Sequence, residues 1–477
     1  MRKGLIVLLA AFAMVAFALP AMADVSFFGY ARVVPTYYSN FDFDSDRADV
    51  ATLNEGGFTF GEHIRGELRL GWKAGGDKWK IMMTAESDLI FNKNNVDRSF
   101  YTSSQIPATG SATAVTNAGA EFGIERAEFS YAFSPALELF TGWPISAVDI
   151  GTGGLLYGDD HPILGFRGKV TDNLKYQLVY IAIQNSPVIG ASEPSVARDW
   201  RAYFLKPEFT VNAGGAKGTL NPILLFSDNR AANAKIFYYG LEGIGQFGMI
   251  KPSFEVIVAD GEFRNPARDI QAYAAFASVE LALSKACNPY VAVRYTSGDD
   301  NTSDTDVEGF VGITDIGRFT PLMGMDGNIL GEHLSSGAFY NSPLYSYAPD
   351  RAVGGNAYGG ISNASSGNNP GSKIIAVGAK GSLDDFVKNL SYKAQVFGIW
   401  FDKTENLSVG AGKTVSKVDT FAGYTVDLNL KYDFSKNFSA SYIFSGFFPG
   451  DGIKDQQATT ANDTFASTNT VNLVWTY

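Results

Sequence analysis

The chain has 477 residues, and its 38 Lys and Arg against 49 Asp and Glu give a formal net charge of −11. This acidic excess disfavours nucleic acid as a partner. Cys287 is the single cysteine, which excludes an internal disulfide framework and also the Cys-x-x-Cys-His motif of a covalently attached c-type haem.

The N-terminal 23 residues have the pattern of a secretory signal peptide. Two basic residues precede an uncharged apolar run over residues 4–19, and Ala21-Met22-Ala23 follows as a small-x-small cleavage site. We therefore expect residues 1–23 to be removed and residues 24–477 to form the exported protein. An uncleaved anchor helix is the alternative.

The mature region is rich in residues that favour strands, with 23 Tyr, 36 Phe and 51 Gly in the chain. Its most regular stretch, residues 63–72, alternates strictly. One face carries no polar side chain, whereas the other carries four ionisable residues in succession: His63, Arg65, Glu67 and Arg69. This pattern is typical of a membrane strand with one face toward lipid and one toward a water-filled lumen. A soluble sheet also alternates, so the rest of the chain must decide.

Strands, short turns and longer loops then follow one another along the chain. Short turns are predicted at residues 73–77, 134–135, 171–173, 212–215, 247–248, 284–288 and 382–386 and at Ser435. Longer segments fall between them, and the count of strands is about 18. The sequence thus predicts an all-β fold, a transmembrane antiparallel up-and-down β-barrel with short periplasmic turns and long extracellular loops. A soluble sandwich gives no reason for this alternation.

Two predicted strands are irregular. Phe122 and Ile124 share a phase with Arg126, whereas Phe129 takes the opposite phase, and a β-bulge near Arg126 would reconcile them. Pro252 must lie near the start of its strand or at a bulge, because proline cannot donate a ladder hydrogen bond.

The last stretch alternates up to the final residue. Val471, Leu473, Trp475 and Tyr477 share one face, which we expect to contact lipid. The stretch should pair with residues 25–38 and close the barrel. Its terminal aromatic resembles the signal that bacterial barrel-assembly machinery reads, so deleting residues 475–477 should impair insertion before it alters conductance.

The tryptophans give an independent indication. All lie in predicted strands in the outward phase, as expected for aromatic girdles at the two membrane interfaces. The predicted interface aromatics are Trp72, Trp79, Trp143, Trp200, Trp400, Trp475 and Tyr477.

Phase also assigns a set of charged residues to the lumen wall. The predicted pore-lining residues are Arg65, Glu67, Arg69, Glu86, Asp88, Arg126, Glu128, Arg167, Lys169, Lys175, Arg201, Arg294, Lys380, Lys393 and Asp427, with Glu138 and Glu280 in the same phase. Basic residues outnumber acidic ones in this set, although the chain is acidic. Since rings of charge tune the selectivity of a pore, we predict a mild anion preference. The alternative is that these charges pair across strands and only brace the wall.

No catalytic set stands out. The three histidines, His63, His161 and His333, have no adjacent nucleophile motif such as G-x-S-x-G, so no enzyme is expected. Two acidic groups could bind Ca²⁺, but their spacing does not match an EF-hand loop, so solvated acidic loops are preferred and no metal or cofactor is predicted. These groups are Asp42, Asp44 and Asp46, and Asp299, Asp300, Asp304 and Asp306.

The segment from 298 to 370 is far longer than an ordinary connection. It is rich in Gly, Asn and Ser with apolar patches. We expect an extracellular loop that folds into the mouth as a constriction or lid, and a disordered surface loop is the alternative.

Two C-terminal motifs resemble the alginate-export family of outer-membrane porins in its broad sense. One is Arg294-Tyr295-Thr296-Ser297-Gly298-Asp299-Asp300, which leads from a strand into the long loop; the other is Thr425-Val426-Asp427-Leu428-Asn429-Leu430-Lys431-Tyr432, which is followed by Phe447-Phe448-Pro449-Gly450. The resemblance implies an 18-stranded barrel. Its namesake exports an anionic polysaccharide through an arginine-lined lumen, and many relatives serve other solutes.

The preferred function is therefore a passive porin in the outer membrane of a Gram-negative cell, for small hydrophilic and perhaps anionic solutes. Its expected partners are outer-membrane lipid and lipopolysaccharide, the assembly machinery and the solutes. The alternatives are an export channel for an alginate-like polysaccharide, the barrel sleeve of a porin-cytochrome electron conduit, and an outer-membrane hydrolase.

Overall fold

The computed structural model describes residues 24–39, 62–90, 120–144, 146–149, 152–159, 161–184, 199–230, 233–264, 267–301, 303–310, 312–313, 370–410, 412–456 and 465–477. The predicted signal peptide, the aspartates at 42, 44 and 46, His333 and residues 314–369 of the long loop lie outside the described residues. In the described part of the chain, no helix is both long and apolar enough to cross a membrane.

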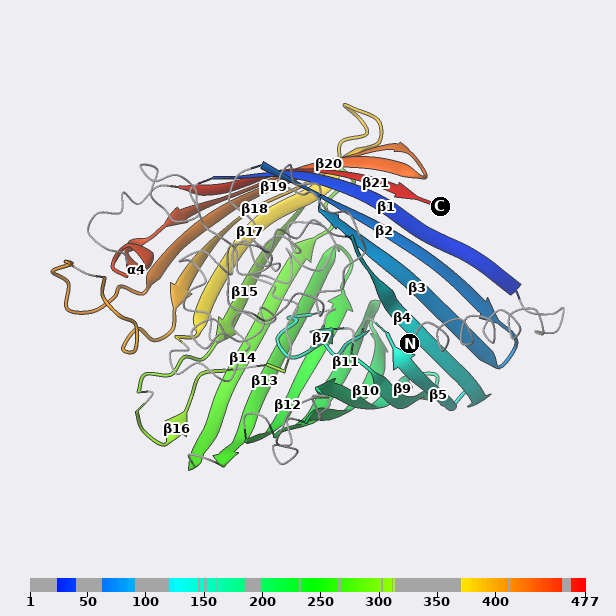
Figure 1. Ribbon diagram of the computed structural model, residues 1–477, viewed down its shortest axis with the longest axis horizontal. Coiled ribbons are helices and arrows are strands. Elements are labelled where there is room, and N and C mark those ends of the chain that lie inside the picture. The colour runs from blue at the N-terminus through cyan, green and yellow to red at the C-terminus, as the bar shows by residue number, and fades with distance from the viewer. Residues whose placement is uncertain are drawn as a thin grey trace.

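Within the described residues, eighteen antiparallel strands form one closed barrel (Figure 1). They are β1 (Asp24–Ser39), β2 (Glu62–Gly75), β3 (Trp79–Ile90), β4 (Ala120–Ser134), β5 (Leu137–Trp143), β8 (Ile163–Thr171), β9 (Leu174–Gln184), β10 (Trp200–Ala213), β11 (Ala216–Asn229), β12 (Ala234–Gln246), β13 (Ile250–Arg264), β14 (Ala267–Leu281), β15 (Asn288–Thr296), β17 (Ser372–Ser382), β18 (Leu390–Phe401), β19 (Phe421–Ser435), β20 (Phe438–Pro449) and β21 (Ala466–Thr476). Four short elements complete the described structure: β6 (Ser146–Ala147), β7 (Gly158–Asp159), β16 (Asp306–Val307) and the single-turn helix α4 (Asp451–Lys454).

The first and last strands close the barrel, as the alternation of the final stretch predicted. β21 pairs with β1 in antiparallel register, with Ala31 opposite Trp475, and the two strands lie side by side in Figure 1. Trp475 is 42% exposed and its ring stacks on Phe438 with centroids 4.7 Å apart. Every barrel strand thereby has two neighbours, and no sheet edge is left open.

The short turns gather at one end of the barrel, here named the short-turn end. β10 and β11 are joined there by Gly214 and Gly215, whose φ angles of +58° and +85° favour glycine. β8 and β9 are joined at residues 172–173, and β19 and β20 at residues 436–437. β1 begins and β21 ends at this same end, as an even number of strands requires.

Both predicted irregularities are confirmed. The register between β3 and β4 pairs Thr84 with Arg126 but Ala85 with Ile124, so the bulge skips Glu125. Pro252 is the third residue of β13, where it faces Val279 near the start of the strand.

The two faces of the barrel differ in exposure. On β15, Val291 and Val293 are both 45% exposed. Ala292, which lies between them, and Arg294, which follows them, are buried. The same alternation holds on β8, β13 and β17. The buried face is the inner one, because a chain segment within the barrel contacts it, and the exposed apolar face is the outer one.

A packed apolar cluster lies inside the barrel, against the inner faces of strands from β8 to β20, and its part on β10 to β13 meets the inward-turning connections. Phe204, Ile223, Tyr238 and Ile257 are almost fully buried there. They pack with residues of two connections that turn inward, the one between β5 and β8 and the one that follows β15. The inner wall is therefore apolar in this sector, contrary to a uniformly polar lumen.

Candidate functional site: the inner wall and its infolded segments

Most of the predicted pore-lining side chains lie on the inner face. Their strand phase is opposite to that of exposed apolar neighbours such as Leu68, Val377 and Val396. The residues placed this way are Arg69, Glu86, Arg126, Glu128, Glu138, Arg167, Lys169, Lys175, Glu280, Arg294, Lys380, Lys393 and Asp427. For Arg65, Glu67 and Asp88 the structure describes the backbone alone. That any of these residues governs conduction stays a prediction.

Many of these charges pair with each other. Arg69 Nε donates to Glu86 at 2.6 Å across the β2–β3 ladder. The Arg167 guanidinium donates twice to Glu138, at 2.9 and 3.0 Å, and lies 4.7 Å from the centre of the Phe140 ring. Arg126 pairs with Glu128, and Lys175 pairs with Glu208 at 3.1 Å. The alternative in which charges brace the wall therefore describes this side of the barrel, from β2 to β10.

Two predicted pore-lining residues are enclosed. Arg294 is 4% exposed and Asp427 is 3% exposed. The Asp427 carboxylate accepts hydrogen bonds from Gln395 at 2.7 Å and Ser445 at 2.6 Å. Both side chains belong to the packed inner wall and offer little surface to the lumen.

The predictions for Trp200 and Arg201 were wrong. On β10, Ala202 and Phe204 face inward, so Trp200 faces inward with them, and its indole donates to buried Ser227 at 2.8 Å. Arg201 therefore takes the outward phase, at the strand end, where it pairs with Asp199 at 2.7 Å. The ladder to β9 shifts between Trp200 and Arg201, and charge alone did not reveal which face Arg201 takes.

The other predicted interface aromatics lie on the outer face. Trp143 and Tyr477 are 46% and 55% exposed. Trp79 lines an outer groove with Tyr131, and Trp72 and Trp400 share the phase of exposed apolar neighbours on β2 and β18. Their contact with lipid headgroups stays a prediction.

The connection between β5 and β8 turns into the barrel. Its described residues, 146–149 and 152–159, form the small β6–β7 hairpin and are here named the inner segment. Leu155, Leu156 and Tyr157 of the inner segment are at most 2% exposed. Ile313, on the connection that follows β15, donates its backbone N–H to Leu156 at 2.8 Å. The described start of the predicted 298–370 loop thus packs inside the barrel.

The inner segment contacts a carboxyl cluster that the phase reading missed. Glu242 of β12 and Glu255 of β13 lie directly opposite each other, and one carboxyl oxygen of each lies within hydrogen-bonding distance of the Thr152 hydroxyl, at 2.7 and 2.9 Å. Asp149 of the inner segment completes the cluster and is fully buried. The sequence does place one glutamate in the inward phase of β12 and one in the inward phase of β13. It does not indicate that the two side chains face each other or that the inner segment contacts them.

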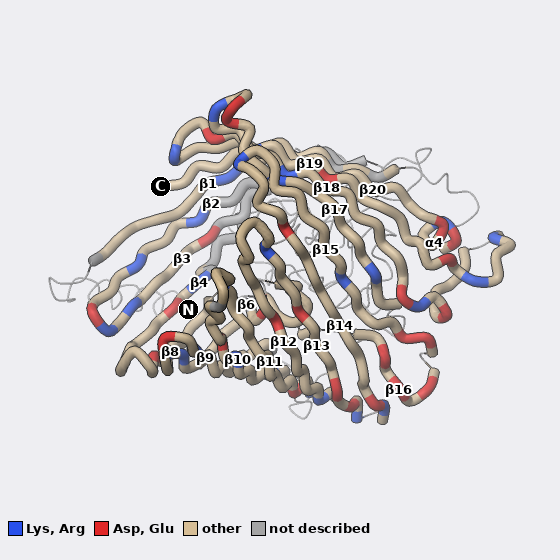
Figure 2. The backbone as a smooth tube through the Cα atoms, turned by 180° about the vertical axis from the view of Figure 1, so that it is seen from behind, with Lys and Arg blue, Asp and Glu red and all other residues tan. Residues whose placement is uncertain are grey.

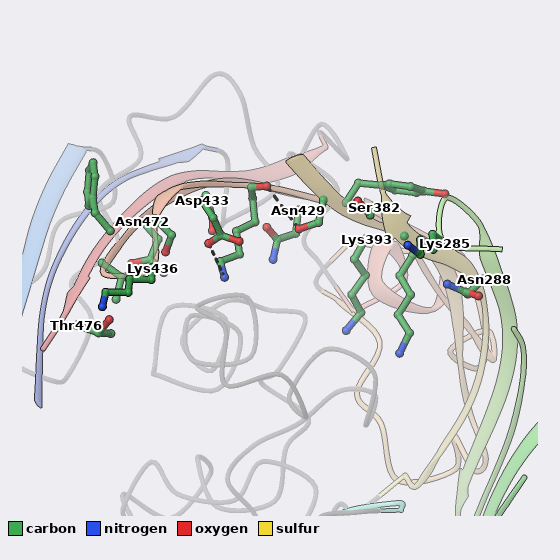
Figure 3. Close-up of a pocket in the computed structure, with 18 of the residues that line it drawn as sticks. Lys285, Asn288, Ser382, Lys393, Asn429, Asp433, Lys436, Asn472 and Thr476 are labelled. Atoms are coloured by element: carbon green, nitrogen blue, oxygen red, sulfur yellow. Dashed lines mark hydrogen bonds and ion pairs between the residues drawn. The ribbon is translucent and has the colours of Figure 1, made fainter. Parts of the chain in front are cut away.

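A second feature is a cavity of about 770 Å³ on the inner wall at the short-turn end. Figure 3 shows Lys393 and Lys285 directed into it from β18 and from the turn after β14. Its charged residues are Lys251, Lys285, Lys380, Lys393, Lys431, Lys436, Glu280 and Asp433. Six ammonium groups against two carboxylates leave an excess of four positive charges. The opposite end of the barrel is here named the long-loop end. Figure 2 shows acidic residues there, around β16 and α4.

Three of these lysines have carboxylate partners in the cavity. Lys251 and Lys380 each lie 2.9 Å from Glu280, and Lys431 lies 3.0 Å from Asp433. Lys285 and Lys436 form no ion pair with a described residue. The ammonium groups of Lys285 and Lys436 are therefore open to a solute.

The aspartates after β15 are engaged in local contacts. Asp299 accepts the backbone N–H of Asn301 at 3.0 Å, and Asp300 pairs with Lys403 at 2.8 Å. In the described part of the chain, no group of three or more His, Cys, Asp or Glu residues is arranged to hold a metal ion.

No protein-family model and no curated protein matches the chain. Several solved structures, however, align with most of the chain. OccAB2 of Acinetobacter baumannii aligns over 95% of this chain and 98% of its own, with 11% identity and a TM-score of 0.55. OpdK of Pseudomonas aeruginosa, solved with vanillate, aligns over 95% and 98% with 10% identity and a TM-score of 0.53. OccK2 (OpdF) of the same organism, solved with glucuronate, aligns over 95% and 97% with 11% identity and a TM-score of 0.51.

These neighbours are outer-membrane porins, and the likeness shows that this chain has their barrel fold. The resemblance of the C-terminal motifs to the alginate-export family gains no support from the comparisons.

Proposed function

We propose that this chain is an outer-membrane porin through which small hydrophilic solutes diffuse passively, with a preference for anions. The observation that carries the proposal is the excess of lysine over carboxylate in the cavity at the short-turn end. The closed barrel and its fold neighbours, two of which were solved with the organic anions vanillate and glucuronate, support it.

Electrostatics supports an anion preference at this end. An anion about 4 Å from an ammonium group gains about 1 kcal/mol in bulk water and about 4 kcal/mol at the effective dielectric of a protein surface. Several lysines around one cavity reinforce each other within the Debye length of about 10 Å at 0.1 M salt. The preference should therefore weaken as salt concentration rises.

In this proposal the short-turn end faces the periplasm and the apolar outer face contacts membrane lipid and lipopolysaccharide. Trp475 and Tyr477 at the end of β21 would present the aromatic terminus that barrel-assembly machinery recognises. The expected partners are thus lipid, the assembly machinery and the solutes themselves.

Swelling of proteoliposomes with glucose or glucuronate tests the proposal, since these solutes are similar in size and differ by a carboxylate. We expect glucuronate to enter faster than glucose through the wild-type protein. The triple variant Lys285→Gln, Lys393→Gln and Lys436→Gln should lose that advantage while it still admits glucose.

Lys413→Gln is the matched control, because this lysine lies in the connection between β18 and β19, at the opposite end of the barrel. It makes the same change of charge per site and should leave both rates unchanged. Absence of swelling with either sugar would reject a diffusion channel, and faster entry of glucose would reject the anion preference.

A further inference from the structure

The carboxyl cluster joins the inner segment to four strands of the barrel wall, β10 to β13. Glu242 accepts from Asn221 of β11 at 2.7 Å and pairs with Lys206 of β10 at 2.5 Å. The same Lys206 ammonium also donates to the backbone carbonyl of Val148 in the inner segment. Wall and segment are therefore held together by polar contacts in addition to the apolar cluster.

Two acidic side chains directly opposite each other on a sheet repel if both are ionised. Glu242 and Glu255 are in this position, and they are 3% and 0% exposed. Glu255 Oε2 accepts from the backbone N–H of Gly153 at 2.5 Å and from Thr152. The inner segment thus supplies the donors that make this pairing tolerable.

A hydrogen bond within the cluster requires a proton. The Thr152 hydroxyl lies within hydrogen-bonding distance of one oxygen of Glu242 and one oxygen of Glu255, and its single proton can serve only one of them, so the other contact needs a proton on a carboxyl group. Both oxygens of Asp149 already accept backbone N–H groups, from Leu156 at 2.6 Å and Tyr157 at 3.1 Å. Glu255 Oε1 is buried and receives no donor from a described residue, so an ionised Glu255 would leave this oxygen unsatisfied.

The charge of the cluster agrees with this assignment. Among the described residues, one ammonium group, that of Lys206, pairs with this cluster, so full ionisation of Asp149, Glu242 and Glu255 would bury two net negative charges, which is unfavourable without further partners. Burial raises the pKa of the Asp149 carboxyl above its ordinary value. Loss of the proton would turn a bonded contact into a repulsion.

The remaining titratable groups that face the cluster are few among the described residues. Tyr238 of β12 is buried and donates its hydroxyl to the Gly312 carbonyl at 3.5 Å. Tyr157 of the inner segment lies 3.2 Å from His161 Nδ1.

We propose that Asp149, Glu242 and Glu255 form a proton-dependent latch that holds the inner segment against the barrel wall and frees it at alkaline pH. The sign follows from linkage: a group that gains affinity for its proton on docking stabilises the docked state at low pH, and that stability is lost as pH rises. Because the inner segment fills part of the lumen, its release changes the open pore. This inference concerns the pore's shape and does not depend on which solute passes.

Thiol labelling tests the latch directly. Leu155 is 1% exposed in the inner segment, whereas native Cys287 is exposed at the short-turn end. In the Leu155→Cys variant, the ratio of the labelling rates at 155 and 287 with a water-soluble maleimide cancels the general effect of pH on thiol reactivity. We expect this ratio to rise as the pH is raised from neutral into the alkaline range, by up to about tenfold per pH unit.

Glu255→Gln is the decisive variant, because glutamine keeps the shape and neutrality of the protonated acid. In the Leu155→Cys background it should keep the labelling ratio low and constant across this pH range. Asp427→Asn is the control, since Asp427 is also buried in the wall but bonds to Gln395 and Ser445, away from the inner segment. It should leave the rise in the ratio unchanged.

Single-channel recordings of the chain without the cysteine substitution give a second readout, in case Leu155→Cys fails to fold. Conductance or open-channel noise should change reversibly over the same pH range in the wild type and stay constant in Glu255→Gln. A wild-type protein without any pH response would overturn the proposal. So would a Glu255→Gln variant that responds like the wild type, or an Asp427→Asn variant that alone loses the response.

Discussion

At the scale of residues, the ion pairs of the inner wall decide how much charge a passing solute meets. Glu280 forms ion pairs with both Lys251 and Lys380, each at 2.9 Å. A substitution at Glu280 therefore tests how its charge affects conduction. Glu280→Gln removes one negative charge and leaves both ammonium groups without this partner. We expect the zero-current potential to move toward greater anion preference.

The same substitution should change the free energy of unfolding by no more than about 1 kcal/mol, because partly exposed ion pairs contribute little. Glu262→Gln is the matched control, since Glu262 is exposed on β13 at the long-loop end and pairs with Arg264 at 3.1 Å. It should leave the zero-current potential unchanged. A move toward cation preference in Glu280→Gln would contradict the account.

Strand phase predicted the face of residues such as Arg69 and Arg167 but not their partners. A partner depends on the register between two strands, and register is set by pairing across the whole sheet. Trp200 and Arg201 show that strand phase is hard to predict at the end of a strand. There the sequence Asp199-Trp200-Arg201 fits either phase, and only the continuation through Ala202 and Phe204 fixes it.

At the scale of elements, β21 completes the closure of the barrel. Its Trp475 stacks on Phe438 of β20, and the Tyr477 hydroxyl donates to the Arg69 carbonyl at 3.2 Å. A Cβ at Gly29 would lie 2.3 Å from that hydroxyl oxygen, so glycine lets the Tyr477 ring cross β1. The side chains of Trp475 and Tyr477 are thus fitted to the seam between the first and last barrel strands.

Deletion of residues 475–477 should therefore lower the yield of inserted, folded barrel, while channels that do form keep the wild-type conductance. Folded protein in outer-membrane fractions and single-channel recordings measure the two quantities. Tyr477→Phe keeps the ring and should assemble normally. Wild-type amounts of the truncated protein would contradict a role of this terminus in assembly.

The strands and short turns were predictable, because alternation and turn residues are local properties of the sequence. The inner segment was not. Its Gly-rich residues 151–154 read as an external loop, and it folds inward because apolar residues of distant strands, such as Phe204 and Ile257, provide a surface for Leu155 and Leu156. Tertiary packing of this kind leaves no periodic signal in the segment itself.

At the scale of the whole molecule, the interior is asymmetric. The inner segment and the connection after β15 pack against β9 to β14, whereas the lysine cavity lies on the inner faces of β13 to β21 at the short-turn end. The apolar cluster also includes residues of β17 to β20, so packing and open charge are separated along the length of the barrel as well as around it.

Phe204→Ala tests the packed side. This side chain is 2% exposed, and truncating a buried phenylalanine removes about 3–5 kcal/mol of packing. Since the barrel's own hydrogen bonds remain, we expect a folded barrel with larger open-channel noise. Phe209→Ala is the control on the same strand, on the outer face and 41% exposed, and it should leave the noise unchanged. Equal noise in both variants would contradict packing of the inner segment on β10.

The central claim, an anion-preferring passive channel, is tested most directly by the zero-current potential of the wild-type protein in a planar bilayer under a KCl gradient. The account predicts a potential with the sign of chloride preference that shrinks as total salt rises and approaches zero in the Lys285, Lys393 and Lys436 triple glutamine variant. A clear potential of the opposite sign, showing preference for potassium, would contradict it.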